Sequence, residues 1–145
     1  MTQGLTTLET LTDTTIDSAL GYEKAAERAD APQLSQTFRE KGNQRRQMAA
    51  QLNQEITRLG GSPRADGSFS GDAHRAFVGL VDAFGDSNEN AVKRVEEGED
   101  YIRGKFESAL NDDELTLESR QLVQQCASQI QADERFADQL EGQYS

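Results

Sequence analysis

Residues 21–61 read GYEKAAERADAPQLSQTFREKGNQRRQMAAQLNQEITRLGG, and this stretch decides the fold. On both sides of Asp30-Ala31-Pro32, apolar residues recur three and four positions apart, the spacing of an amphipathic helix. The residue before a proline disfavours the helical conformation, whereas Pro32 suits the first turn of a new helix. Gly60-Gly61 is a typical C-terminal helix stop. We therefore expect two helices, about 6–28 and 32–59, joined by a tight turn as an antiparallel hairpin.

The second half of the chain follows a linker and repeats the helical pattern. The stretch GGSPRADGSFSGD (60–72) matches no phosphate-binding spacing and follows no strand, so we expect a linker that crosses the bundle. Beyond it, the apolar spacing predicts a short helix at about 72–84 and two long ones at about 88–110 and 114–141. The expected architecture is all-α. It is a single domain, 1–145, formed by an antiparallel four-helix bundle with a short extra helix between its two hairpins.

Composition and charge exclude several classes of partner. The net charge is −11, and a surface this acidic would be repelled by nucleic acid and by anionic membranes. Cys126 is the single cysteine, which rules out an intramolecular disulfide and fits a reducing compartment. The N-terminus, MTQGLTTLETLTDTT, has no signal-peptide pattern, and no apolar run is as long as a membrane span. We expect a cytoplasmic protein that binds neither nucleic acid nor membrane.

Two charged residues, Arg45 and Glu99, interrupt the apolar stripes near the middle of their helices. In di-iron and di-manganese bundles, two helices each supply an inward Glu and the other two supply Glu-x-x-His. Here the corresponding spacings read Arg45-Arg46-Gln47-Met48 and Ile130-Gln131-Ala132-Asp133, and Ile16 holds the inward position midway along the first helix. Only Glu99 matches the requirement, so the sequence does not predict a di-metal site.

Three stretches together resemble a known family. The hairpin quoted above, EEGEDYIRGKFESAL (96–110) and HRAF (74–77) are similar to a bacterial family of small ferritin-like four-helix-bundle proteins of unknown function. The resemblance covers nearly the whole chain and implies a ferritin-like bundle. It does not imply an oxidase, because the chain departs from the ferroxidase pattern at Arg45, Met48 and Ile130.

A buried arginine needs a partner, because an unpaired charge in the interior costs several kcal/mol. We hypothesise that the guanidinium of Arg45 fills the space that a metal would occupy, within an interior polar cluster of Arg45, Glu99, Glu23 and Asp133. The alternative is that the helix rotates slightly, so that Arg45 reaches solvent and only its aliphatic stem packs.

The other polar residues have plainer interpretations. Tyr22 is expected in the core, with its hydroxyl bonded to an inward polar group. His74 is expected at the surface or as a cap, and Cys126 as a small hydrophobic residue. Within the acidic run Glu96–Asp100 only Glu99 is expected to point inward. The other carboxylates are expected to form a solvated surface, with a surface divalent-cation site as the alternative.

Two functions remain open at this stage. The first is a non-catalytic bundle with a degraded di-metal site and no cofactor, which acts through packing or protein contacts and forms a homo-oligomer with no identified protein partner. The second is a metal-binding ferritin-like protein that holds iron or another divalent metal through Glu23, Glu99 and Asp133. No residue pattern supports an enzyme beyond buried carboxylates whose pKa values could be shifted.

Overall fold

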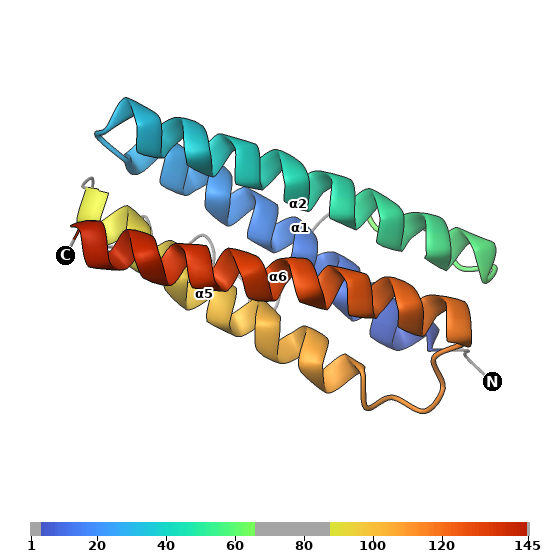
Figure 1. Cartoon of the computed structure of the whole chain (residues 1–145). Helices are drawn as coiled ribbons and strands as arrows, with labels where there is room; N and C mark the ends of the chain where they lie inside the picture. The colour runs from blue at the N-terminus through green and yellow to red at the C-terminus, as the bar shows by residue number, and fades with distance from the viewer. Residues whose placement is uncertain (1–3, 66–87, 145) are drawn as a thin grey trace.

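The computed structural model describes residues 4–65 and 88–144, which form four α-helices and, within those ranges, no strand (Figure 1). The helices are α1 (Leu5–Arg28), α2 (Pro32–Arg58), α5 (Asn88–Ala109) and α6 (Leu117–Tyr144). The first two form one hairpin, the last two form another, and the hairpins pack along each other as a bundle. The all-α bundle expected from the sequence is confirmed. The expected short helix at 72–84 lies outside the described residues.

α1 is the helix with the most extensive packing. It contacts α2 along its length and also contacts α5, whereas α2 and α6 touch at only a few places. The seam between α2 and α6 is therefore the most open one among the described helices. None of these helices is both long enough and apolar enough to span a bilayer.

The turn between α1 and α2 is fastened to the start of α5. The side-chain oxygen Oδ1 of Asn88 accepts hydrogen bonds from the backbone nitrogens of Asp30 and Ala31, at 2.7 and 2.9 Å. Inside the hairpin, the Ser35 hydroxyl donates to the Ala26 carbonyl at 2.7 Å. These bonds satisfy two backbone N–H groups of the turn and a carbonyl group in the last turn of α1. The two bonds to Asn88 join the two hairpins at this end of the bundle.

The connection at the other end explains why α6 begins at Leu117 rather than at 114. The Asp112 carboxylate accepts a hydrogen bond from the backbone nitrogen of Glu114 at 2.9 Å, which holds a turn instead of a helix. Thr116 then serves as the N-cap, because its hydroxyl accepts a hydrogen bond from the Ser119 nitrogen at 3.1 Å. The sequence pattern alone did not reveal this cap.

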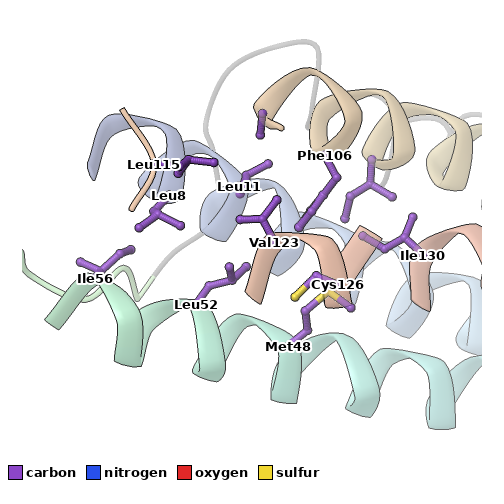
Figure 2. Close-up of a cluster of buried hydrophobic side chains, with 12 residues drawn as sticks. Leu8, Leu11, Met48, Leu52, Ile56, Phe106, Leu115, Val123, Cys126 and Ile130 are labelled. Atoms are coloured by element: carbon purple, nitrogen blue, oxygen red, sulfur yellow. The ribbon is translucent and has the colours of Figure 1, made fainter. Parts of the chain in front are cut away.

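The apolar core consists of two clusters at different levels of the bundle. Figure 2 shows the larger cluster, in which side chains from all four helices meet. The second cluster lies nearer the turn between α1 and α2 and includes Tyr22, Phe38 and Val95. Along each helix, a polar residue falls between the members of the two clusters: Ser18 on α1, Arg45 on α2, Glu99 on α5 and Asp133 on α6. A polar layer therefore lies between two apolar ones.

Candidate functional site

The centre of the polar layer is a two-point ion pair between α2 and α5. Nη1 of Arg45 lies 2.7 Å from Oε1 of Glu99, and Nη2 lies 2.7 Å from Oε2. Each residue is only 1 % exposed. A guanidinium and a carboxylate that meet through two parallel hydrogen bonds form one of the strongest pairings available to side chains. Arg45 therefore points into the bundle and not to solvent.

The same guanidinium binds the two remaining helices. Nη2 of Arg45 donates to Oδ2 of Asp133 on α6 at 2.9 Å, and Nη1 donates to the hydroxyl of Ser18 on α1 at 2.7 Å. The other oxygen of Asp133 accepts hydrogen bonds from Lys41 at 2.8 Å and from Gln129 at 3.0 Å. One arginine thus connects all four described helices.

The charges of this cluster balance. Two cations, Arg45 and Lys41, face two carboxylates, Glu99 and Asp133. Burial tends to raise the pKa of Asp133, but hydrogen bonds from Lys41 and the charge of Arg45 outweigh it, so the pKa is lowered. Burial tends to lower the pKa of Arg45, yet the Glu99 carboxylate raises it overall. The cluster is therefore an internally neutralised set of ionised groups.

Tyr22 completes the surroundings of the ion pair. Its ring centre lies 5.5 Å from Cζ of Arg45, a distance at which a cation and an aromatic face attract each other. Its hydroxyl is hydrogen-bonded to Glu99, as the sequence led us to expect of a core tyrosine. Burial raises the pKa of Tyr22 well above its ordinary value, so it remains a neutral donor. Burial also raises the pKa of Glu99, while Arg45 opposes this shift and favours the carboxylate.

Glu23, which we expected in the interior cluster, instead lies at the surface. Its carboxylate pairs with Arg46 at 3.0 and 3.1 Å, and both side chains are more than two-fifths exposed, at 42 % and 44 %. The reason is that Tyr22 takes the inward position of this helical turn. Successive residues on a helix point about 100° apart, so Glu23 faces outward. The structure thus brings together three of the four residues expected in the cluster: Arg45, Glu99 and Asp133.

The cluster contains three residues that were not predicted from the sequence: Ser18, Lys41 and Gln129. Their spacing in the sequence could have indicated them. Ser18 lies four residues before Tyr22, Lys41 four before Arg45, and Gln129 four before Asp133, and all three of these later residues were predicted to lie in the interior. Residues four apart lie on the same helical face, one turn away. Serine, lysine and glutamine are, however, common on exposed helix faces, so the spacing alone does not distinguish them.

A cleft between α2 and α6 leads to the cluster. It has a volume of about 270 Å³ and is lined by Arg45, Met48, Cys126, Asp133 and five glutamines, at positions 44, 47, 51, 125 and 129. Burial raises the pKa of the Cys126 thiol to about 11, with Arg45 opposing the shift. A thiol that is protonated at neutral pH is a poor nucleophile, so Cys126 acts as an apolar residue next to Met48 in the core (Figure 2).

These residues do not fit a di-metal cofactor. Both oxygens of Glu99 and one oxygen of Asp133 already accept hydrogen bonds from Arg45. A divalent cation here would meet the fixed positive charge of Arg45 at short range, where repulsion is strong. In the part of the chain that the structure describes, no group of three or more His, Cys, Asp or Glu side chains is placed to hold a metal ion.

Comparisons with known proteins identify a family but no individual relative. A family model described as "Domain of unknown function (DUF2383)" matches residues 3–112. This range contains Ser18, Arg45 and Glu99, whereas Asp133 on α6 lies beyond it. No curated protein matches the chain, and no solved structure does either. Because the match spans well over half of the 145 residues, the chain belongs to the DUF2383 family.

Proposed function

We propose that this chain is a non-catalytic, ferritin-like helical bundle that acts through packing or through contacts with other proteins. In this proposal an arginine has replaced the di-metal site. The observation that carries the proposal is the two-point pairing of Arg45 with Glu99, 2.7 Å at both contacts, in the middle layer of the bundle.

The helix arrangement supports the ferritin-like part of the proposal. Ferritin-like folds consist of two hairpins joined by one long crossover connection, and their metal ligands project inward from all four helices. In this chain the two hairpins are separated by about thirty residues between α2 and α5. The polar layer likewise contains a residue from each of the four helices. An antiparallel arrangement of all four helices is part of this proposal.

The chemistry of the layer supports a structural rather than a catalytic role. The ionised groups neutralise one another, and Tyr22 and Cys126 both keep their protons at neutral pH. A buried ion cluster contributes little net stability compared with apolar packing, but it disfavours arrangements that leave its charges unpaired. We infer that Arg45 fixes the register of the four helices, as polar core residues do in some coiled coils.

The proposal also includes a homo-oligomer in a reducing compartment, which we take to be the cytoplasm. Exposed apolar side chains on the described surface, Leu117 and Phe136, are residues that a second copy would cover. The single buried cysteine fits a compartment in which disulfides are rare. Sedimentation of the purified chain as a monomer at high concentration would contradict the oligomer.

Metal analysis tests the central part of this proposal. Protein purified without chelators is expected to contain no stoichiometric iron, manganese or zinc, because Arg45 occupies the carboxylates that would bind them. Elemental analysis by mass spectrometry measures this directly. Stoichiometric metal in the wild-type protein would overturn the proposal and favour the carboxylate metal site instead.

A double substitution tests the ferritin-like geometry from the opposite direction. Arg45→Glu combined with Met48→His restores the Glu-x-x-His spacing beside Glu99 and Asp133, on a face that points inward. If circular dichroism shows that the double variant is a folded bundle, we expect it to bind Mn²⁺ or Zn²⁺ at least about tenfold more tightly than the control variant Arg46→Glu does. The control introduces the same change of charge at the exposed neighbouring position. A folded double variant without such binding would argue against the ferritin-like arrangement.

A further inference from the structure

Exposed glutamines line both sides of the cleft between α2 and α6. Gln44, Gln47 and Gln51 recur three and four residues apart, so they lie on one face of α2. Gln125 and Gln129 lie four residues apart on α6 and line the same cleft. We call the surface formed by these five side chains the glutamine face.

Apart from Gln44, the glutamine face lies within two uncharged stretches of the chain. Residues 47–54 of α2 include no charged side chain, and residues 121–132 of α6 are the longest run without one in the whole sequence. Charged residues make up 28 % of the chain, so two such stretches side by side on one exposed surface are unusual. Depletion of charged residues is the compositional feature that distinguishes the centre of a protein interface from other surface.

Charged side chains lie at both ends of the glutamine face. At one end, Nζ of Lys41 lies 5.1 Å from the ring centre of Phe136, which is one of the exposed large apolar residues on the described surface. At the other end, where α2 ends and α6 begins, Arg58 and Glu118 are exposed (Figure 1). An uncharged centre with a charged and polar rim is the usual arrangement of a protein interface.

The surface between these two ends is large enough for a dimer. From Lys41 to Arg58, α2 extends for about 26 Å, and two adjacent helices together are roughly 20 Å wide. Their product is about 500 Å² on each copy, or about 1,000 Å² in total, which is the smallest area expected of a specific interface.

A second copy of this chain is the partner that fits the glutamine face best. Each copy has a net charge of −11, so two copies repel each other least where they meet through uncharged surfaces. A two-fold symmetric interface brings the same surface of both copies together, so this surface must complement itself. Amide side chains do so, because each one has both hydrogen-bond donors and an acceptor.

We propose that two copies associate through the glutamine face as a symmetric dimer, in which amide side chains pair across the two-fold axis and Phe136 is covered at the edge. This inference rests on the homo-oligomer of the proposed function and specifies the surface that forms it.

Sedimentation equilibrium of paired variants tests the glutamine face. Gln47→Glu combined with Gln125→Glu changes little in shape but places four like charges near the centre of the dimer. We expect its dissociation constant to rise at least about tenfold, because like charges that meet across an interface are strongly unfavourable. Gln124→Glu combined with Gln131→Glu is the matched control. It adds the same charge at exposed positions of α6 that line a separate cavity with residues of α5, and it should dimerise like the wild type.

The opposite charge separates this effect from general repulsion between acidic proteins. Gln47→Lys combined with Gln125→Lys makes the net charge of each copy less negative, which by itself would favour association. We nevertheless expect this variant to dimerise at least about tenfold more weakly than the wild type, because like charges again meet across the interface. Mixing it with the Glu variant in equal amounts should restore dimers, and circular dichroism of each variant checks that the bundle is folded.

The possible results distinguish this inference from the homo-oligomer on which it rests. A wild-type chain that stays monomeric at high concentration would contradict both, and another molecule would then be the partner of the glutamine face. A wild-type dimer that the Glu and Lys variants leave as stable as the control does would overturn the glutamine face alone, because the copies would then associate through another surface.

Discussion

Replacing Arg45 with Met is expected to lower the free energy of unfolding by about 3–5 kcal/mol, the usual cost of removing one partner from a buried ion pair. The methionine side chain fills much of the same volume but leaves Glu99 buried with Tyr22 as its remaining donor. Asp133 is less affected, because Lys41 and Gln129 still donate to it. Urea denaturation followed by circular dichroism measures the loss.

Arg46→Met is the matched control for this prediction, since the two arginines are adjacent in the sequence and each pairs with one glutamate through two contacts. Arg46 and Glu23 lie at the surface, where ion pairs contribute about 0–1 kcal/mol. The control should therefore change stability by no more than about 1 kcal/mol. Equal and small losses in the two variants would mean that Arg45 is not a buried, paired charge in solution.

A double-mutant cycle between Arg45 and Glu99 is expected to show strong coupling. Glu99→Gln alone leaves the guanidinium with a weaker acceptor, and Arg45→Met alone leaves the carboxylate without its counter-charge. The double variant contains neither unpaired charge, so its loss of stability should be smaller than the sum of the two single losses by about 2–3 kcal/mol. The same denaturation measurements on the four proteins provide this value.

The corresponding cycle for Arg46→Met and Glu23→Gln provides the comparison. These side chains are more than two-fifths exposed, so water and salt screen their attraction. Their coupling energy should stay below about 1 kcal/mol. A coupling for Arg45 and Glu99 as small as the surface value would show that the two residues do not depend on each other in the folded protein.

The sequence predicted the helical architecture well where local chemistry specified it. Pro32 marks the start of α2, and the expected end at residue 59 lies one residue beyond Arg58, the last residue of that helix. The prediction for α6 was less accurate at its start. The cap depends on the Thr116 hydroxyl and on a turn held by Asp112, and apolar periodicity does not detect either feature.

The composition of the polar layer was only partly predictable. The central positions of Arg45 and Glu99 on apolar stripes predicted that both would be buried, because each lies three or four residues from an apolar residue on the same face. The placement of Glu23 could not be predicted as securely. Both Tyr22 and Glu23 were expected to face inward, but adjacent residues on a helix point about 100° apart, and which of the two faces the interior depends on how α1 rotates against α2. The contributions of Ser18 and Lys41 depend on alignment between helices, which one sequence does not contain.

A crystal structure determined from protein grown and crystallised with Mn²⁺ present tests the central claim most directly. Anomalous scattering would locate any manganese between α2, α5 and α6. The account predicts no anomalous peak there, with the guanidinium of Arg45 in contact with both oxygens of Glu99 and with Asp133. A manganese ion bound to Glu99 or Asp133, or an Arg45 side chain extended into solvent, would contradict it.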